Sequence, residues 1–245
     1  MLIVNADDWG CDQKTTDCIL DCIHCGTVSS VSAMVFMADS GRAAGLAQQH
    51  QIDAGLHLNL TLRFSDAKVP AQLLHHQTRI SHFLRGHRLS QVVFHPGLIS
   101  SFDYLVAAQC DQFASLYGHE PSRIDGHHHM HLCANILFGG LIPTGTMVRR
   151  NFSFGPGEKG LANRRYREAI DWVLGRRHLL TDYFFSIQPL ATSGRLEQII
   201  ELSRHHAVEL ETHPNDPAEY AFLTGPGIQK FAESSIMARR FTVNQ

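Results

Sequence analysis

The sequence predicts an α/β fold, a single-domain distorted (β/α) barrel of parallel strands that resembles a TIM barrel and occupies residues 1–245. Short apolar runs alternate with amphipathic helical patterns and no linker interrupts them, which is typical of βαβ units around a parallel sheet. About seven such units in a chain of this length fit a barrel, closed or incomplete, better than an open sheet. An open dinucleotide-binding sheet would carry G-x-G-x-x-G after its first strand, and that motif is absent there.

The elements of the first half follow from apolar runs and their spacing. Leu2-Ile3-Val4 is apolar enough for a buried strand, and residues 14–25 repeat apolar side chains at helical spacing before Gly26, which suits a helix C-terminus. Strands are expected over residues 28–36 and 53–61, with a helix over 40–49 between them. Residues 62–99, with scattered His, Arg and Pro, are less regular, and no element is predicted for them.

The second half continues the alternation. Ser100 or Ser101 is expected to cap a long helix that Gly118 closes. Apolar runs and helical spacing predict the remaining elements: strands over residues 124–132, 146–149, 183–187, 208–212 and 241–243, helices over 161–173, 196–205 and from about 228, and a loop after residue 212.

Composition and charge exclude several function classes. The 21 Lys and Arg against 23 Asp and Glu give a net charge of -2, and no basic run supplies the field of a nucleic-acid binder. No apolar stretch reaches the ~18 residues of a membrane span. The N-terminus shows no basic region or cleavage site of a secretion signal, so we expect a soluble, cytoplasmic protein.

Six cysteines leave two interpretations open. Cys18, Cys22 and Cys25 have the C-x3-C-x2-C spacing with which radical S-adenosylmethionine enzymes hold an iron–sulfur cluster. The same stretch reads as an amphipathic helix, in which cysteines pack as small hydrophobic residues. A large cytoplasmic domain has no need of a disulfide scaffold, so we expect the cysteines in the core.

Polar residues stand where the predicted strands end, which is where active sites form in parallel α/β folds. Asp7 and Asp8 follow the first strand, and two adjacent carboxylates lose hydration and repel each other unless a cation or a turn relieves them. His57 lies in the third strand, on the face opposite to its leucines. There it is either a metal ligand or a core residue whose hydrogen bonds are satisfied within the protein.

The histidine-rich segment 125–131 is the strongest metal signal among the 17 His of the chain. Strand alternation would place Asp125, His127, His129 and His131 on one side, and neutral imidazoles are good metal ligands. His213 ends another strand, before Pro214. A site with three protein ligands, a spare carboxylate and a spare histidine is typical of metal-assisted hydrolysis of an amide or ester.

Four motifs together resemble the YdjC-like (chitooligosaccharide deacetylase) family. The motifs are Asn5-Ala6-Asp7-Asp8-Trp9-Gly10, Gly55-Leu56-His57-Leu58-Asn59-Leu60-Thr61, Asp125-Gly126-His127-His128-His129-Met130-His131 and Thr212-His213-Pro214. They follow the family's order over nearly the whole chain. The resemblance implies a distorted (β/α) barrel, a divalent metal and removal of an N-acetyl group from an amino sugar.

By the same resemblance, the metal ligands are Asp8, His57 and His127, the general base is Asp7, and the general acid is His213. A carboxylate bound to metal is a poor proton acceptor, so its free neighbour suits the base, and an amine leaves only when it is protonated. The resemblance also suggests Mg²⁺, with Zn²⁺ or another transition metal open, a small carbohydrate substrate and a homodimer. No nucleic-acid or membrane partner is expected.

The sequence departs from the family pattern in its loops, and the substrate stays open. Trp9 stands where the family usually has Phe, and no proline follows His131 at the usual place. In residues 147–160, Arg149 and Arg150 could contact a phosphorylated or acidic sugar or belong to a solvated loop. The alternatives are another amide, a lipid-linked or phosphorylated amino sugar, and a metal-dependent sugar-binding protein without turnover.

Overall fold

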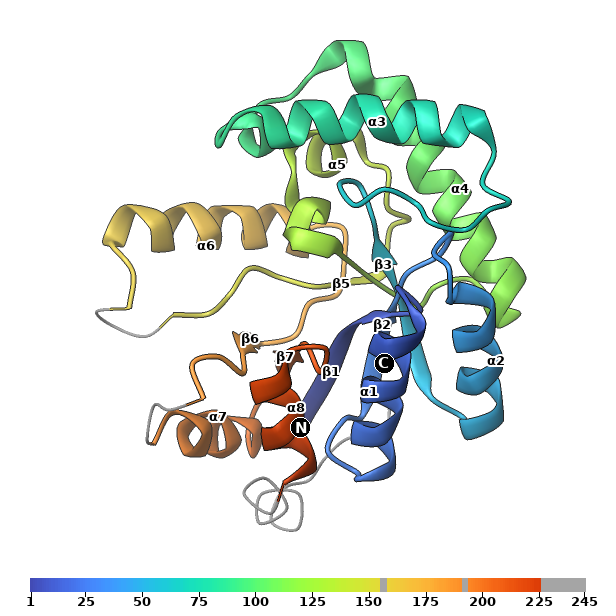
Figure 1. Cartoon of the computed structure of the whole chain (residues 1–245). Coiled ribbons are helices and arrows are strands. Elements are labelled where there is room, and N and C mark those ends of the chain that lie inside the picture. Colours follow the sequence, from blue (N-terminus) through green and yellow to red (C-terminus); the bar gives the residue numbers. More distant parts are fainter. Residues whose placement is uncertain (155–157, 191–193, 226–245) are drawn as a thin grey trace.

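The computed structural model describes residues 1–154, 158–190 and 194–225, and seven parallel strands within them form one sheet. The sheet order is β5-β4-β3-β2-β1-β7-β6, so the N-terminal strand lies inside the sheet, between β2 and β7 (Figure 1). The strands are β1 (Leu2–Trp9), β2 (Ser30–Ala33), β3 (Asp53–Leu58), β4 (Arg123–Gly126), β5 (Met147–Val148), β6 (Tyr183–Ser186) and β7 (Val208–Thr212). The sheet curls into a half-barrel, which confirms the predicted barrel-like α/β fold.

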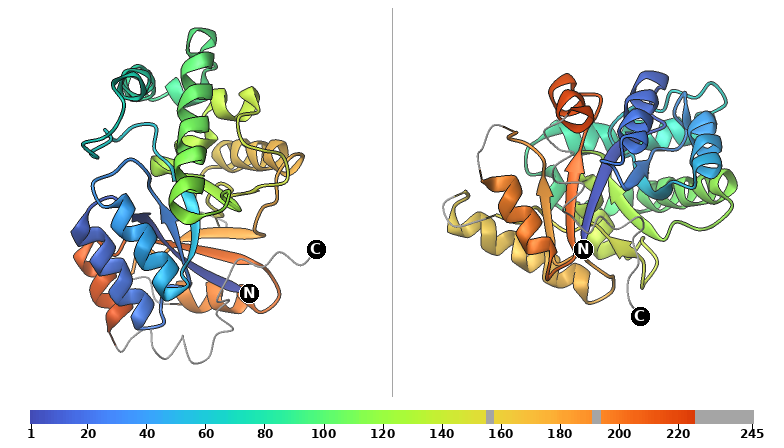
Figure 2. Two further views of the ribbon diagram at one scale, coloured as in Figure 1. Left: turned by 90° about the vertical axis from the view of Figure 1, so that its right-hand side faces the viewer. Right: turned by 90° about the horizontal axis from the view of Figure 1, so that it is seen from below.

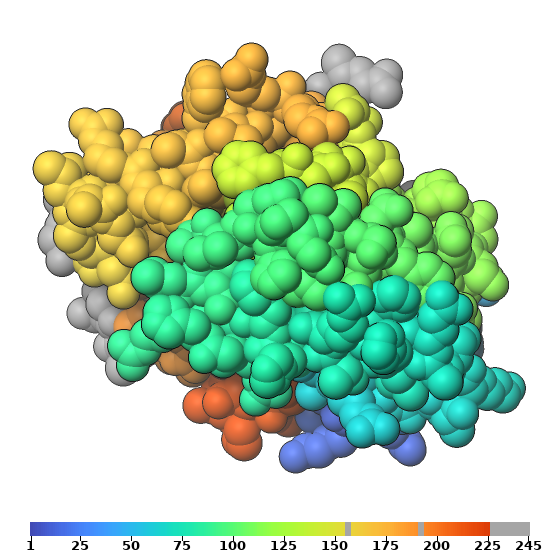
Figure 3. All heavy atoms as spheres, turned by 90° about the horizontal axis from the view of Figure 1, so that it is seen from above, coloured from blue at the N-terminus to red at the C-terminus, as the bar shows by residue number. Residues whose placement is uncertain are grey.

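Helices alternate with the strands and cover the sheet. They are α1 (Gln13–His24), α2 (Ser40–His50), α3 (Ala71–Gly86), α4 (Ile99–Tyr117), α5 (Ala134–Gly139), α6 (Leu161–Gly175), α7 (Arg195–Ser203) and α8 (Pro217–Thr224). Figure 2 shows α8, α1 and α2 side by side along one side of the sheet. Seen from above in Figure 3, α3 and the chain that leads into α4 cover that end of the molecule, with α6 beside them.

The core lies between these helices and the sheet. Every residue of β1 is buried, and Leu56, Leu58 and Leu60 of the β3 region are fully buried. Gly55 belongs to the opposite face of β3, where the buried guanidinium of Arg123 lies so close that a Cβ would be 2.8 Å from its Nε. The lack of a side chain at Gly55 therefore lets Arg123 reach Asp53 at 3.2 Å.

The structure corrects the predictions for residues 62–99 and for the start of the next helix. Residues 62–99 include α3, which buries Leu73, Gln77, Ile80 and Leu84 along one face at helical spacing. Gln and His residues interrupt the apolar pattern of this helix, so the sequence did not reveal it. Two short 3₁₀ segments, η1 (Ser90–Val92) and η2 (Pro96–Leu98), follow α3. Helix α4 begins at Ile99 without a side-chain cap, and Ser101 instead contacts His76 and Arg79.

Near the C-terminus, the predicted loop after residue 212 contains α8, which the carboxylate of Asp216 caps and Pro217 begins. The helix expected from about residue 228 and the strand over 241–243 lie outside the described residues.

The cysteine run lies on a helix rather than in a loop. Cys18 and Cys22 belong to α1 and Cys25 is its C-cap residue, and all three are free. Cys22 is buried, as expected, whereas Cys25 is exposed, so the prediction that all cysteines are in the core is wrong at that position. No described helix has the length and apolarity needed to cross a bilayer.

Candidate active site

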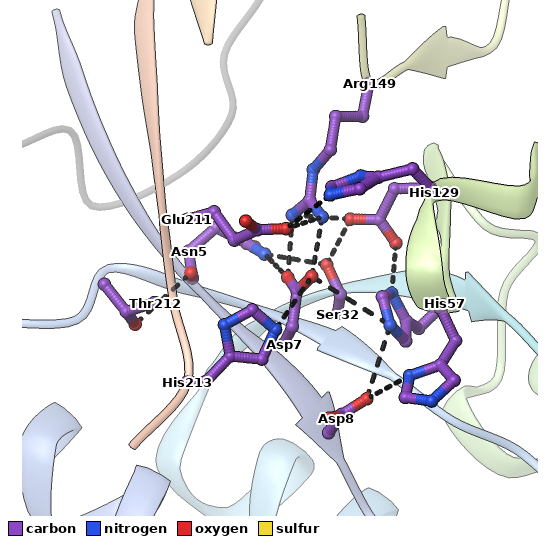
Figure 4. Close-up of polar contacts among 12 residues, drawn as sticks. Asn5, Asp7, Asp8, Ser32, His57, His129, Arg149, Glu211, Thr212 and His213 are labelled. Atoms are coloured by element: carbon purple, nitrogen blue, oxygen red, sulfur yellow. Dashed lines mark hydrogen bonds and ion pairs between the residues drawn. The ribbon is translucent and has the colours of Figure 1, made fainter. Parts of the chain in front are cut away.

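The polar residues at the carboxyl ends of β1, β3, β4 and β7 meet in one cluster (Figure 4). Asp7 and Asp8 come from β1, His57 from β3, His127 from the turn after β4, and His213 directly follows β7. These strands are consecutive neighbours in a curled sheet apart from β2, so their ends converge. The structure thus brings together all five residues that the sequence analysis selected.

A bulge in β1 lets two adjacent carboxylates face the same site. The register with β2 pairs Ala6 with Val31 and then Trp9 with Ala33, so β1 carries one extra residue in this interval. Asp8 has the left-handed φ of 67°, which Asp tolerates better than most residues. In a regular strand Asp7 and Asp8 would point to opposite faces, whereas here both lie close to His57.

Asp8, His57 and His127 have the geometry of a three-ligand metal site. Asp8 Oδ1 lies 3.4 Å from His57 Nε2 and 2.9 Å from His127 Nδ1, and one donor atom from each residue lies within 4.8 Å of the others. Tetrahedral coordination with bonds near 2.1 Å separates donor atoms by roughly 3.4 Å. The three donors therefore fit a divalent cation after small adjustments, and His127, with 13% of its side chain exposed, borders the open side.

Two other groups of acidic and histidine residues fit a cation less well. They are Asp7 with His57 and Asp125, and Asp7 with Glu211 and His213. Both include Asp7, whose two oxygens each lie 2.7 Å from a guanidinium nitrogen of Arg149. A positive charge already occupies the place where a cation would bind, so the Asp8 group is the better candidate.

A second layer of contacts orients His57. Its Nδ1 is 2.8 Å from Asp125 Oδ1, while its Nε2 faces Asp8. Asp125 Oδ2 accepts a hydrogen bond from Ser32 at 2.5 Å and lies 2.7 Å from Arg149 Nη2. A carboxylate behind a histidine fixes its ring and increases its basicity, which is a common support for metal ligands.

Arg149 holds four acidic residues together and has no exposed side-chain surface. It contacts Asp7 and Asp125 as described, Glu209 Oε1 at 2.7 Å, and Glu211 Oε1 at 3.3 Å. Asp7 Oδ1 also accepts a hydrogen bond from Asn5 at 2.8 Å. Both oxygens of Asp7 are therefore fixed by donors, which sets the orientation of this carboxylate.

The charges of the cluster shift its pKa values in opposite directions. Burial alone would raise the pKa of Asp7, but the charges of Arg149 and His57 hold it well below its ordinary value. The same two residues lower the pKa of Asp125, again against the effect of burial. Burial and the charge of Asp7 raise the pKa of Glu211 well above its ordinary value. Asp7 is therefore ionised at neutral pH.

The segment after β4 differs from its prediction. We expected a strand through residue 132, with alternate side chains on one side, and this is wrong because β4 ends at Gly126 and the 3₁₀ segment η3 (His127–Leu132) follows. His128 and His129 have φ values of 55° and 56°. Their side chains diverge, since His128 Nδ1 is 3.1 Å from Thr61 Oγ1 and His129 Nε2 is 3.5 Å from Glu211 Oε1.

His213 borders the site at the end of β7. Its Nε2 lies 4.0 Å from Asp7 Oδ2, and 39% of its side chain is exposed, against 2% for Asp7. Its backbone N–H donates to Glu219 at the start of α8 at 2.6 Å, which fixes the chain where it leaves the strand. A ring in this position can meet a molecule that approaches from solvent while remaining next to the buried carboxylate.

The two arginines considered for substrate contact are occupied within the protein. Arg149 is buried in the carboxylate cluster, and Arg150 Nη2 pairs with Asp171 at 2.9 Å. The contact of Arg149 with Asp7 was not predicted from the sequence. The signal available was its position at the end of the predicted strand over residues 146–149, where the side chains of a parallel fold enter the site.

Comparisons with known proteins agree with these motifs. A family model described as YdjC-like protein matches residues 1–235. A carbohydrate deacetylase of Danio rerio is 32% identical over 139 residues, which are 55% of this chain and 43% of that protein. A chitooligosaccharide deacetylase of Klebsiella pneumoniae is 31% identical over 142 residues, 56% of this chain and 52% of that protein. The chain spans about half the length of the curated relatives it matches.

A solved structure also resembles the chain in its fold. A candidate cellobiose-phosphate cleavage protein of Enterococcus faecalis V583 superposes with a TM-score of 0.69 over 97% of this chain and 96% of that chain. The sequence identity is 20%, so this likeness establishes the fold alone.

Proposed function

The chain belongs to the YdjC-like family, and from this premise we propose that it is a metal-dependent hydrolase that removes the N-acetyl group from an amino sugar, such as an oligosaccharide of N-acetylglucosamine. The observation that carries the proposal is the convergence of Asp8, His57 and His127 beside Asp7, a second buried carboxylate. The names of the deacetylase relatives support the carbohydrate substrate.

Asp8, His57 and His127 would hold the cation. When bound, a divalent ion there supplies Lewis-acid polarisation of the acetamido carbonyl and favours deprotonation of a nearby water. The two imidazoles suit Zn²⁺ or another transition metal better than Mg²⁺, which prefers oxygen ligands, whereas the resemblance suggests Mg²⁺. Asp125 would keep the His57 ring turned with Nε2 toward the ion.

Asp7 would act as the general base. Arg149 keeps it ionised and Asn5 fixes its orientation, so the carboxylate is ready to accept a proton from the attacking water. It is buried against the cluster but faces His213 across 4.0 Å. A base held by charged hydrogen bonds loses little orientation entropy when it reacts.

His213 would act as the general acid. The amine of an amide leaves only after it is protonated, and a histidine at the mouth of the site can reach that nitrogen from the solvent side. Its partly exposed ring and its position beside Asp7 suit this task.

The test is acetate release from N-acetylglucosamine oligomers, measured with chelator and after addition of Mg²⁺ or Zn²⁺. We expect metal-dependent acetate, loss of bound metal in D8A, H57A and H127A, and retained metal with at least about a hundredfold slower turnover in D7N and H213A. The exposed residues Asp111 and His205 provide matched controls as D111N and H205A. Full activity of D7N or H213A would refute the acid–base assignment.

The same assay separates the alternatives. Acetate from a lipid-linked or phosphorylated amino sugar, but not from neutral oligomers, would show that the substrate differs from the proposed one while the reaction is the same. Tight sugar binding without acetate from any N-acetylated sugar would contradict the hydrolase proposal and favour a binding protein.

A further inference from the structure

A pocket of about 480 Å³ lies between the segment after β3 and the helix α3. Its lining includes Thr61, Arg63, Gln77, Ser81, His82 and Arg85, and we call it the Arg63–Arg85 pocket. Thr61 and Gln77 are buried, and the two arginines are exposed at the rim. A ligand from solvent can therefore reach the pocket past two cationic side chains.

The wall of the pocket is fixed by hydrogen bonds within the protein. Ser81 donates to the Thr61 carbonyl at 3.0 Å, and the Gln77 side chain donates to the Leu62 carbonyl at 2.7 Å. Gln77 also accepts from the Phe64 N–H at 3.1 Å. The segment that carries Arg63 is thus held against α3, so the pocket does not depend on a freely moving loop.

The charges of the pocket are unbalanced. No Asp or Glu lines it, and Arg63 and Arg85 have neither a hydrogen-bond partner nor an ion-pair partner in the part of the chain that the structure describes. By contrast, Arg42 and Arg150 each pair with a carboxylate. Two guanidinium groups at one hollow match the planar, two-oxygen geometry of phosphates and carboxylates.

The pocket adjoins the candidate metal site. Thr61 Oγ1 lies 3.1 Å from His128 Nδ1, and the His128 ring lies against the ring of His127 with centroids 4.0 Å apart. Two side chains therefore separate the pocket from a proposed metal ligand.

We propose that the Arg63–Arg85 pocket binds an anionic group of the substrate, a phosphate ester or a carboxylate, carried beyond the acetamido sugar. This inference rests on the proposed function for its link to the substrate. The positive charges of the two arginines would attract such a group to this flank of the site. The substrate would then be oriented by the metal site at its acetamido end and by the two arginines at its anionic end.

A second hollow of about 230 Å³ provides the competing location. It is lined by His128, His129 and Arg167, among others, on the side of α6. Arg167 already donates to the Asn163 side chain at 2.9 Å and to the Asn151 side chain at 3.3 Å, so its guanidinium is partly satisfied by neutral groups. We therefore place the anion at the Arg63–Arg85 pocket.

The test is calorimetric binding of three probes to the metal-loaded chain: glucose 6-phosphate, glucuronate and neutral glucose. We expect at least one anionic probe to bind more tightly than glucose, and R63M/R85M to weaken its binding by about 10- to 100-fold without changing glucose binding. R63K/R85K, which keeps the positive charges but lacks the planar guanidinium groups, should weaken anion binding less than R63M/R85M does. The two anionic probes distinguish a phosphate from a carboxylate.

R88M is the matched control, because Arg88 is exposed and close to Arg85 in sequence but does not line the pocket. Equal binding of all three probes, unchanged anion binding in R63M/R85M, or a loss in R167M instead would overturn the inference. If neutral oligomers release acetate and the pocket variants bind as the parent does, the proposed function stands without it. If the anion binds through Arg63 and Arg85 but no N-acetylated sugar releases acetate, the proposed function fails and the pocket remains an anion site.

Discussion

Replacement of Arg149 by Met should destabilise the protein strongly, because the guanidinium balances a set of buried carboxylates. Arg149 lies at 2.7 Å from Asp7, Asp125 and Glu209, and at 3.3 Å from Glu211. Methionine has a similar length and no charge. The substitution leaves the carboxylates buried without their cation.

The size of the effect follows from the burial. Removal of one partner from a buried charge network costs about 3–5 kcal/mol, a large part of the roughly 5–15 kcal/mol by which domains are stable. Arg149 has no exposed side-chain surface and Asp7 and Asp125 are almost fully buried, so water screens little of this loss. We therefore expect the free energy of unfolding of R149M to fall by about 3–5 kcal/mol at pH 7.

The loss should depend on pH. Arg149 lowers the pKa of Asp7 and Asp125 in the folded state. A depressed carboxyl pKa contributes stability above the unfolded value of about 3.9, and this contribution disappears as the pH falls through the folded pKa. The stability difference between the parent and R149M should therefore be largest above about pH 5 and should narrow below about pH 4.

Urea unfolding of the metal-free chain at several pH values measures this difference, and R149K is the control that keeps the charge. A loss below about 0.5 kcal/mol in R149M would show that the carboxylates do not depend on Arg149. A large loss of equal size at all pH values would instead indicate that Arg149 acts through packing.

Two further predictions concern the support of the metal ligands and the close packing behind them. In D125N, His57 loses the carboxylate that orients its ring. We expect calorimetry to show a metal affinity about 10- to 100-fold lower than that of the parent, whereas D111N should bind the metal as the parent does. Equal metal affinity of D125N and the parent would argue against this support. In G55A, the new Cβ would meet Arg123 at 2.8 Å, so urea unfolding should show a loss of about 1–3 kcal/mol, whereas G45A, which has open space in α2, should be neutral or stabilising.

The residues of the candidate site could be predicted from the sequence because each lies in a predicted strand or just after one. The rule that parallel strands present their carboxyl ends at one edge drew attention to Asp7, His57 and His213, although it left their roles open. The ligand roles of Asp8, His57 and His127 were inferred from the family resemblance, and the structure places these residues together.

The supporting contacts were not predictable in the same way. The bulge in β1 and the left-handed residues after β4 arise from backbone irregularities that no periodic pattern encodes. Arg149 comes from a two-residue strand region, and its partners are distant in sequence. Helix α3 was missed because Gln77 occupies a buried position in its apolar stripe.

The placement of β1 between β2 and β7 has a consequence for the order in which the site assembles as the chain is made. Residues 8, 57 and 127, the three candidate donors, all emerge from the ribosome before Arg149, Glu211 and His213. One edge of β1 pairs with β2 early, whereas the other waits until β7 has been made. During translation the metal-ligand half can therefore assemble first, and the proton-transfer half is completed only when β7 pairs beside Asp7.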